Sequence, residues 1–402
     1  MPKEYASRPN ANPGIAGPGP ADASATREGA FSEPDERLII GTMTGTSIDG
    51  LDAALVSVAG RGHAMRARLV DRRSADFPAE LARRLRHVAE QGTTTAGELA
   101  RLALDFGLFH ADAITPLAQG RSIALVVVHG QTVFHAPPVS LQLLNPAPIA
   151  VGLGAPVLAD LRSVDLAAGG QGAPITPLAD WILFRTDHPR AVLNLGGFAN
   201  ATLLDGTNDP SGVRGFDVCA CNQVLDAVAR RTLHAPYDAD GAAAAAGASE
   251  TRASAELVAA LTAQRAARRS LGTGDEATAW IDRHVATLRA NDLAATAADA
   301  VGTAIGRAVA SALADARLAA GADLVVAGGG ARHRPLVAAI RRAFGGPVST
   351  TAECGVPIEA REAMGMAVLG AVSVDGAAMT LPAVTGRREH GICDGALFRA
   401  RR

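Results

Sequence analysis

Short apolar runs alternate along this sequence with longer stretches that are typical of helices. The runs at 123–128 and 323–327 are continuously apolar, which predicts strands buried in the middle of a sheet. Further strands are predicted at 37–40, 51–58, 64–73, 191–195 and 201–204. Helices are predicted at 79–90, 95–117, 177–185, 222–233, 254–267, 275–289, 292–319 and 335–344. This alternation predicts an α/β fold.

The second half of the chain repeats the plan of the first. In the first half, two strands are joined by the polar, glycine-bearing turn 41–47, and in the second half by the turn 196–200. A chain of 402 residues is also too long for one small core. We therefore predict two duplicated domains around a cleft, at 37–185 and 186–402.

Two stretches predict little regular structure. Residues 1–36 are rich in Pro, Gly, Ala and Ser without an apolar period, which predicts a disordered tail. Residues 137–175 are rich in Gly and Pro. A loop-rich stretch of that length inside a compact domain usually carries function.

Composition narrows the protein class. Hydrophobic residues make up 48% of the chain, charged residues 19%, and the net charge is −2, so no global field favours nucleic acid or an anionic membrane. The sequence has no 18-residue apolar run and no signal-peptide plan at its start. The four cysteines, Cys219, Cys221, Cys354 and Cys393, are widely spread apart from one C-x-C pair, which suits reduced thiols. We expect a cytoplasmic enzyme.

The scarcity of lysine argues against several chemistries. The only lysine is Lys3, inside the predicted tail. P-loop NTPases and protein kinases place a lysine on the phosphates, and Schiff-base enzymes use one as a nucleophile. If this chain handles ATP, it must use backbone N–H groups, Mg²⁺ and arginine.

The segment GTMTGTSIDGLD at 41–52 has the composition of a phosphate-binding turn. Its glycines let the backbone approach a phosphate closely, and its hydroxyl and N–H groups can donate to that phosphate. Its aspartates are hard oxygen ligands that suit Mg²⁺ through water. The candidate nucleotide-binding residues are Gly45, Thr46, Ser47, Asp49, Gly50 and Asp52, with Asp49 and Asp52 as metal ligands. The alternative is an ordinary polar hairpin turn.

Two further glycine turns are candidates for the nucleotide. NLGGFAN at 194–200, with Gly196 and Gly197, could clamp phosphates from the opposite side. VVAGGGARHRP at 325–335 offers a flat surface for an adenine ring or ribose, through the glycines Gly328, Gly329 and Gly330. An ordinary glycine-rich loop explains each turn equally well in isolation.

Candidate catalytic residues lie in DLRSVDLAAGGQGAP at 160–174. Asp165 is a candidate general base, and Arg162 is a candidate fork donor to phosphate. The alternative is a structural Asp160–Arg162 pair with Asp165 capping a turn. For sugar hydroxyl contact we name His129, Gln131 and Thr132, at and just after the end of an apolar strand. For His129, and equally for His135, the alternative is a hydrogen-bonded structural histidine.

An ordered series of motifs resembles the anhydro-N-acetylmuramic acid kinase family. The series runs from about residue 37 to 386 and comprises GTMTGTSIDGLDAALV, VHGQTVFHAP, LQLLNPAPIA, LADLRSVDLAAGGQGAPITP, VLNLGGFANATLL, YDADGAAAAAG, VVAGGGARHRPL, GVPIEAREAMGMAVLGA and LPAVTG. The resemblance overturns the structural interpretation of 160–174. It implies a two-domain actin-like ATPase fold, with ribonuclease H-like duplicated domains around an interdomain cleft.

The resemblance also implies a reaction. The family uses ATP and Mg²⁺ to open 1,6-anhydro-N-acetylmuramic acid with water and to phosphorylate O6, during cell-wall turnover. Asp165 stands at the position of the family's general base, and Gly45–Asp52 matches its phosphate-binding motif. Gln142 and Glu362 fall in matching segments and are expected at the substrate. A homodimer is expected by resemblance alone.

Three segments depart from the family pattern. The segments are Phe216–Asn222, where two glycines have become Cys219 and Cys221, then 269–274, and Gln142-Leu143-Leu144. The cysteines would reduce backbone approach to the nucleotide. Two alternatives follow: a kinase for another anhydro sugar, such as 1,6-anhydroglucose, or a non-catalytic nucleotide-binding regulator.

Overall fold

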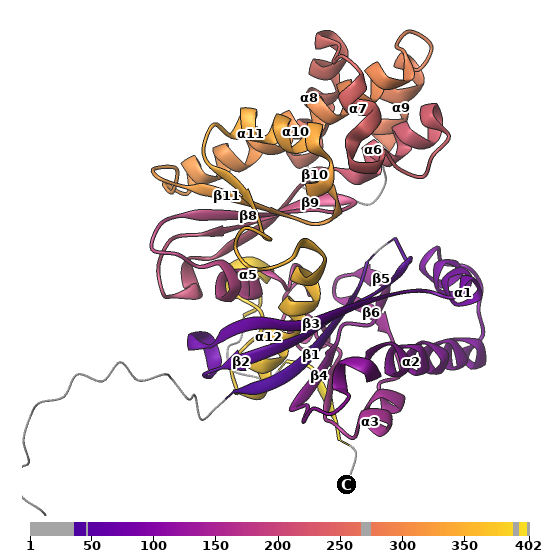
Figure 1. Ribbon diagram of the computed structural model, residues 1–402, viewed down its shortest axis with the longest axis vertical. Coiled ribbons are helices and arrows are strands. Elements are labelled where there is room, and N and C mark those ends of the chain that lie inside the picture. Colours follow the sequence, from indigo (N-terminus) through magenta and orange to yellow (C-terminus); the bar gives the residue numbers. More distant parts are fainter. Residues whose placement is uncertain (1–35, 46, 267–274, 389–393, 400–402) are drawn as a thin grey trace, which may run out of the picture. The chain divides into compact units, whose positions relative to one another are not determined.

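The fold is described from a computed structural model, which covers residues 36–45, 47–266, 275–388 and 394–399 (Figure 1). Of the predicted tail 1–36, residues 1–35 lie outside these residues, as do Thr46 and the segment 269–274. The structure has two main sheets and one two-stranded hairpin.

The first sheet has six strands in the order β13-β7-β4-β1-β2-β3. Their bounds are β1 Arg37–Thr44, β2 Gly50–Ala59, β3 Arg66–Asp76, β4 Leu125–Val128, β7 Val157–Ala159 and β13 Ala396–Phe398. β1, β2 and β3 are antiparallel neighbours, whereas β1, β4 and β7 run parallel. The parallel strand β4 is apolar throughout because it is buried along its whole length.

The second sheet has five strands in the order β10-β9-β8-β11-β12. Their bounds are β8 Arg190–Leu195, β9 Phe198–Leu204, β10 Arg214–Ala220, β11 Asp323–Ala327 and β12 Val348–Thr350. Here too the first three strands form antiparallel ladders and the last two are parallel additions.

Both sheets therefore share one topology. Five strands of each sheet correspond. Counted in chain order within each sheet, they lie in the order third, second, first, fourth, fifth, with the same pattern of parallel and antiparallel pairs. β13 is an addition to the first sheet. This repetition confirms the predicted α/β fold with duplicated, ribonuclease H-like halves. The boundary between residues 185 and 186 stays a prediction.

Helices complete both halves. In the first half they are α1 Ala79–Ala89, α2 Ala96–Ala118, α3 Ala147–Leu153, α4 Ser163–Ala167 and α5 Pro177–Phe184. In the second half they are α6 Asn222–Val228, α7 Ala242–Ala246, α8 Thr251–Ala266, α9 Asp275–His284, α10 Ala290–Asp315 and α11 Arg334–Phe344, followed by α12 Arg361–Val374 and α13 Pro382–Thr385. α2 starts where predicted because Thr95 and Glu98 form a reciprocal capping box.

The C-terminal part of the chain returns to the first sheet. α12 packs on β1, β2 and β4 (Figure 1), and β13 pairs with β7. Close approach of α12 requires Gly41, because a Cβ at Gly41 would lie 2.0 Å from Ala363 O. The range 186–402 therefore contributes a helix and a strand to the first sheet.

The prediction of little regular structure at 137–175 is wrong. The hairpin strands β5 Gln131–Ala136 and β6 Val139–Leu143 pair with each other, and α3, β7 and α4 follow. Short strands such as β7 have weak local signals and are stabilised by pairing with neighbours distant in sequence.

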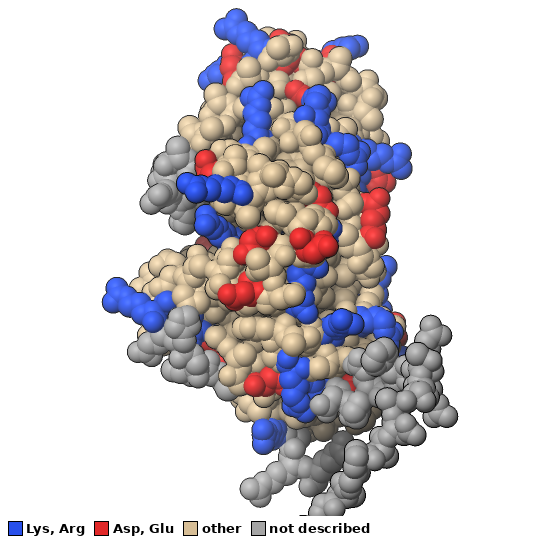
Figure 2. All heavy atoms as spheres, turned by 90° about the vertical axis from the view of Figure 1, so that its left-hand side faces the viewer, with Lys and Arg blue, Asp and Glu red and all other residues tan. Residues whose placement is uncertain are grey.

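Charge is mixed on the surface that Figure 2 draws. Arginine and acidic side chains form small interspersed groups there, and every described basic residue in blue is an arginine. None of the described helices is long and apolar enough to cross a bilayer.

Candidate active site

The first glycine turn joins β1 to β2. Gly45 is partly buried, whereas Ser47 and Asp49 are exposed, so the turn offers polar groups to solvent or ligand. Ile48 has a left-handed backbone, φ 52°, and its buried side chain anchors the turn. Arg86 Nη2 donates to Ile48 O at 2.8 Å and fixes the turn from α1.

The end of β4 lies against this turn. Thr44 Oγ1 donates to Gly130 O at 3.1 Å, and Gln131 Nε2 donates to Gly45 O at 3.3 Å. Gln131 Oε1 is buried and has no hydrogen-bond partner among the described residues. A buried acceptor without a partner costs stability, and such groups cluster where a ligand binds.

His129 and Arg162 form a pair beside these residues. His129 Nδ1 donates to Gly130 O at 2.9 Å, so Nε2 is the acceptor for Arg162 Nε at 3.1 Å and Nη2 at 2.9 Å. Burial, together with the nearby Arg162 charge, lowers the pKa of His129 to about 3. Burial also lowers the pKa of Arg162 to about 10, so the arginine stays charged and the histidine neutral.

Arg162 has no ion pair with a carboxylate in the described part of the chain. The Asp160–Arg162 pair that we considered is absent, because Asp160 Oδ1 instead accepts from Ser163 Oγ at 2.6 Å. The guanidinium is half-buried at the start of α4. A charge held in that way is a good partner for an anionic ligand.

The β5–β6 hairpin brings together Thr132 and Gln142. The two residues are cross-strand partners, and Gln142 Nε2 donates to Thr132 Oγ1 at 3.3 Å. Both are partly buried. His135 lies nearer the end of the hairpin, where its Nδ1 contacts Ser140 Oγ at 2.9 Å.

Asp165 lies on α4 and is completely buried. Its Oδ2 accepts from Gly172 N at 2.7 Å, and its Oδ1 accepts from Thr385 Oγ1 at 2.7 Å. The glycine loop 169–172 wraps the carboxylate closely, since a Cβ at Gly170 would lie 2.2 Å from Oδ2. No hydrogen bond between described residues joins Asp165 to Arg162 or His129.

The second glycine turn and the end of β11 come together. Asn222 N donates to Gly196 O at 3.0 Å, and Asn222 Nδ2 to Leu195 O at 3.1 Å. Gly328 has φ 78°, and a Cβ there would meet Asn194 Oδ1 at 2.6 Å. Gly330 approaches the same Asn222 side chain, whereas Gly329 is exposed. The turn at Gly196 and Gly197 is shorter than predicted, because β9 begins at Phe198.

Three carboxylates lie near these turns. Asn194 Nδ2 donates to Glu362 Oε1 at 3.1 Å, which connects β8 to α12. Burial raises the pKa of Glu362, and the charge of Asp52 raises it further. Burial likewise raises the pKa of Asp52. The hydrogen bond from Ser74 lowers this pKa, and the charge of Asp49 raises it.

Asp49 and Asp52 could share a magnesium ion with the phosphates of a bound nucleotide. Neighbouring negative charges that repel one another are stabilised by a divalent cation. In nucleotide enzymes Mg²⁺ uses one or two carboxylates together with phosphates and water. The described residues hold no group of three or more His, Cys, Asp or Glu side chains placed to bind a metal.

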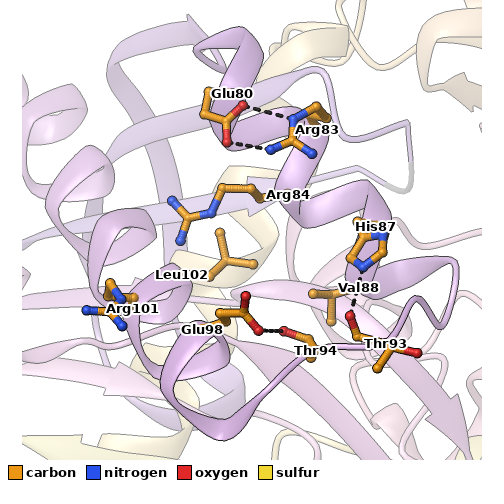
Figure 3. A pocket seen from close by; sticks show the side chains of 10 residues that line it. All are labelled: Glu80, Arg83, Arg84, His87, Val88, Thr93, Thr94, Glu98, Arg101 and Leu102. Carbon is orange, nitrogen blue, oxygen red and sulfur yellow. Dashed lines mark hydrogen bonds and ion pairs between the residues drawn. The ribbon is translucent and has the colours of Figure 1, made fainter.

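A separate hollow of about 330 Å³ lies between α1 and α2 (Figure 3). Several of its charged groups already have partners: Arg83 pairs with Glu80, Arg84 pairs with Asp105, and Glu98 caps α2. None of the predicted site residues lines it. We therefore do not assign the active site to this hollow.

Comparison with known proteins decides the family. The sequence model of the anhydro-N-acetylmuramic acid kinase family matches residues 37–400. The chain belongs to this family. An anhydro-N-acetylmuramic acid kinase from Salinibacter ruber is 34% identical over 379 residues, covering 89% of this chain and 95% of the relative. One from Bordetella parapertussis is 37% identical over 391 residues, covering 94% and 100%. The protein is accordingly a sugar kinase.

Solved structures of lower similarity were also found. The activator of 2-hydroxyisocaproyl-CoA dehydratase from Clostridium difficile, with bound ADPNP, has 14% identity and a TM-score of 0.43, covering 84% of this chain and 95% of that one. A ROK family glucokinase from Streptomyces griseus, in complex with glucose and AMPPNP, has 14% identity and a TM-score of 0.37, covering 83% and 98%.

Two residues of the candidate site were not predicted from the sequence. Asn194 contacts Glu362 and lies against Gly328; its signal was a polar residue near the end of an apolar strand. Thr385 contacts Asp165 from 220 positions away; it lies in the motif LPAVTG, but nothing in that motif indicates a contact with Asp165. Cys219 and Cys221, which depart from the family pattern, are buried in the core of the second sheet.

Proposed function

We propose that this kinase uses ATP to open 1,6-anhydro-N-acetylmuramic acid with water and to phosphorylate O6. The products are N-acetylmuramate 6-phosphate and ADP, as expected for recycling of cell-wall peptidoglycan. The match of the family over residues 37–400 carries this proposal. The contacts of the candidate residues support a role for each of them.

Asp165 is the proposed general base. An anhydro sugar has no free O6 hydroxyl, so a water must first attack the anomeric carbon. Asp165 takes a proton from that water, the bond from the anomeric carbon to O6 breaks, and O6 keeps its electron pair. O6 then attacks the γ-phosphate and ADP leaves. A carboxylate with two donors still has lone pairs free for a proton.

Arg162 is the residue that we propose donates to the negatively charged phosphate. Its Nε and Nη2 are fixed by the neutral His129, which leaves Nη1 and part of the fork for a ligand. Both ring nitrogens of His129 are engaged. We therefore propose that His129 orients Arg162. Contact with the sugar is assigned to Gln131, Thr132 and Gln142.

The glycine turns are the proposed ATP site. The amides around Gly45 and Ser47 would cradle phosphates, as would the second turn at Gly196 and Gly197, and Gly328–Gly330 would take the adenosine side. Asp49 and Asp52 would hold Mg²⁺ through water, and Glu362 would contact the substrate. Bound there, Mg²⁺ would neutralise phosphate charge during transfer.

The buried cysteines favour an active kinase over a nucleotide-binding regulator. Cys221 is completely buried and its N donates to Gly197 O at 2.9 Å, so this substitution keeps the turn in place. The two residues after Gln142 differ from the family pattern. A kinase for another anhydro sugar is therefore the second candidate. A cytoplasmic location, a homodimer and the domain limits 37–185 and 186–402 complete the proposal.

The test is an ADP-release assay on a panel of 1,6-anhydro sugars, with mass spectrometry of the products. We expect the muramic acid substrate to give the phosphosugar. Asp165→Asn should lower kcat by about 10²–10⁴-fold. Asp160→Asn is the matched control, since Asp160 lies on the same segment and an amide oxygen can still accept from Ser163. Full activity of Asp165→Asn would contradict the assignment of the base, and turnover of 1,6-anhydroglucose alone would favour the second candidate.

A further inference from the structure

The Asp165 carboxylate is held by a residue from near the other end of the chain. Thr385 Oγ1 donates to Oδ1 at 2.7 Å, while Gly172 N donates to Oδ2 at 2.7 Å. Both side chains are buried, with Asp165 0% and Thr385 1% exposed. Each carboxylate oxygen thus has one donor, and together these two donors fix the plane of the carboxylate.

The backbone around Thr385 is itself tied to the loop that follows Asp165. Gln171 N donates to Thr385 O at 2.9 Å, and Arg388 N donates to Ala168 O at 3.1 Å. Two backbone hydrogen bonds therefore join 385–388 to 168–171. This arrangement sets the position of the Thr385 hydroxyl relative to Asp165.

A buried ion pair anchors the same C-terminal segment. Arg387 Nη1 lies 2.8 Å from Asp394 Oδ1, and neither side chain is exposed. Asp394 Oδ2 also accepts from Met379 N at 2.7 Å, and Asp394 O from Ser373 Oγ at 2.6 Å. The segment is thus fastened to the end of α12, which packs on the first sheet.

The Thr385 hydroxyl can serve both protonation states of a base. It donates to the carboxylate in the structure, and Leu381 O lies 3.4 Å from Oγ1 as a second acceptor. When the carboxyl has taken a proton from water on a free lone pair, the hydroxyl can keep donating to Oδ1 or can turn toward Leu381 O. A hydroxyl is both donor and acceptor, so the contact survives proton transfer.

We infer that Thr385 is a positioning residue for the reaction, acting through Asp165. Its hydroxyl holds the carboxylate oriented toward the attacking water before and after the proton moves. The inference rests on the proposed function of Asp165 as general base. It gives the C-terminal segment, through LPAVTG, an indirect part in the chemistry.

The test compares the steady-state kinetics of full-length variants. Thr385→Val removes the donor at nearly constant size, and kcat should fall by about 10- to 150-fold, the range for a lost hydrogen bond to a charged group. KM for ATP and for the sugar should change by less than about two-fold, because substrate binding is untouched. Thr385→Ser should restore kcat to within about three-fold of the native enzyme, since it keeps the hydroxyl.

Thr351→Val is the matched control. Thr351 is buried, and its hydroxyl has no hydrogen-bond partner among the described residues, so its loss should leave kcat unchanged. If Thr385→Val does not fold, Thr385→Cys takes its place. A thiol is a weak donor, so kcat should lie between the values of Thr385→Ser and of an enzyme without the donor.

Native kcat in Thr385→Val or Thr385→Cys would overturn the inference, as would a Thr385→Ser variant no better than Thr385→Val. Asp165→Asn in the same assay separates the two proposals. If it is inactive while Thr385→Val is unchanged, the proposed function stands and the inference fails. If Asp165→Asn is fully active, the assignment of the base fails first.

Discussion

At the scale of single residues, the neutral His129 is the clearest titrating group of the candidate site. Burial and Arg162 lower its pKa to about 3, from an ordinary value of 6.5. The unfolded chain therefore binds a proton at this position below about pH 6.5, whereas the folded chain stays neutral down to about pH 3. The contribution of His129 to the free energy of unfolding is therefore fully present above its ordinary pKa of 6.5, and it is lost as the pH falls toward about 3.

His129→Gln should make the stability of the protein fall less steeply as the pH is lowered. Glutamine can still accept from Arg162 but does not titrate. The free energy of unfolding, measured in urea between about pH 6 and pH 4.5, should fall with a slope smaller by about 1.4 kcal/mol per pH unit in the variant. His110, whose pKa is lowered to about 4 by burial, contributes equally in both proteins. Identical slopes would contradict the assigned neutral state of His129.

Residue types at the site were predictable from sequence, but their contacts were not. Glycines, aspartates and an arginine in suitable turns indicated the chemistry. The sequence could not indicate that His129 accepts from Arg162, or that Asp165 is covered by its own glycine loop. Such contacts depend on side-chain geometry across elements far apart in the chain.

At the scale of elements, α12 is the connection between the two sheets. Arg361, in its first turn, forms a buried pair with Asp180 of α5, with contacts of 2.5 Å from Nη2 to both carboxylate oxygens. Thr202 of β9 donates to the same carboxylate at 2.8 Å. The next residue, Glu362, contacts Asn194 of β8. The start of α12 thus ties the first sheet to α5 and to the second sheet.

Arg361→Met should destabilise the fold strongly. It leaves Asp180 as a buried, unpaired charge, which costs about 3–5 kcal/mol. The double variant Asp180→Leu with Arg361→Met should recover part of that loss. Arg83→Met, at the exposed Glu80 pair, should leave the urea midpoint unchanged. An Arg361→Met midpoint equal to that of the native protein would refute this role for the pair.

Long elements were predicted well, and short ones poorly. β4, β11, α2 and α10 have long or uniformly apolar sequences, so their local signals are strong. β7 and β13 each have three residues and exist because they pair with one another in the first sheet. The return of the C-terminal segment to that sheet had no local signal.

At the scale of the whole molecule, duplication supplies two glycine turns for the proposed nucleotide site, which needs no lysine side chain. Each half repeats the same sheet order and opens with a glycine turn, so two sets of backbone amides are available for phosphate. The repeated hairpins made this architecture predictable from sequence. The distribution of ligands between the two halves was not, because Glu362 belongs to a helix packed on the first sheet.

The central claim is that water opens the anhydro ring before O6 is phosphorylated. The most direct measurement is mass spectrometry of the products formed from 1,6-anhydro-N-acetylmuramic acid and ATP in ¹⁸O-water. We predict a single ¹⁸O at the anomeric hydroxyl of N-acetylmuramate 6-phosphate and none in its phosphate group. Label in free phosphate without a phosphosugar, or a phosphosugar without label at the anomeric carbon, would contradict the account.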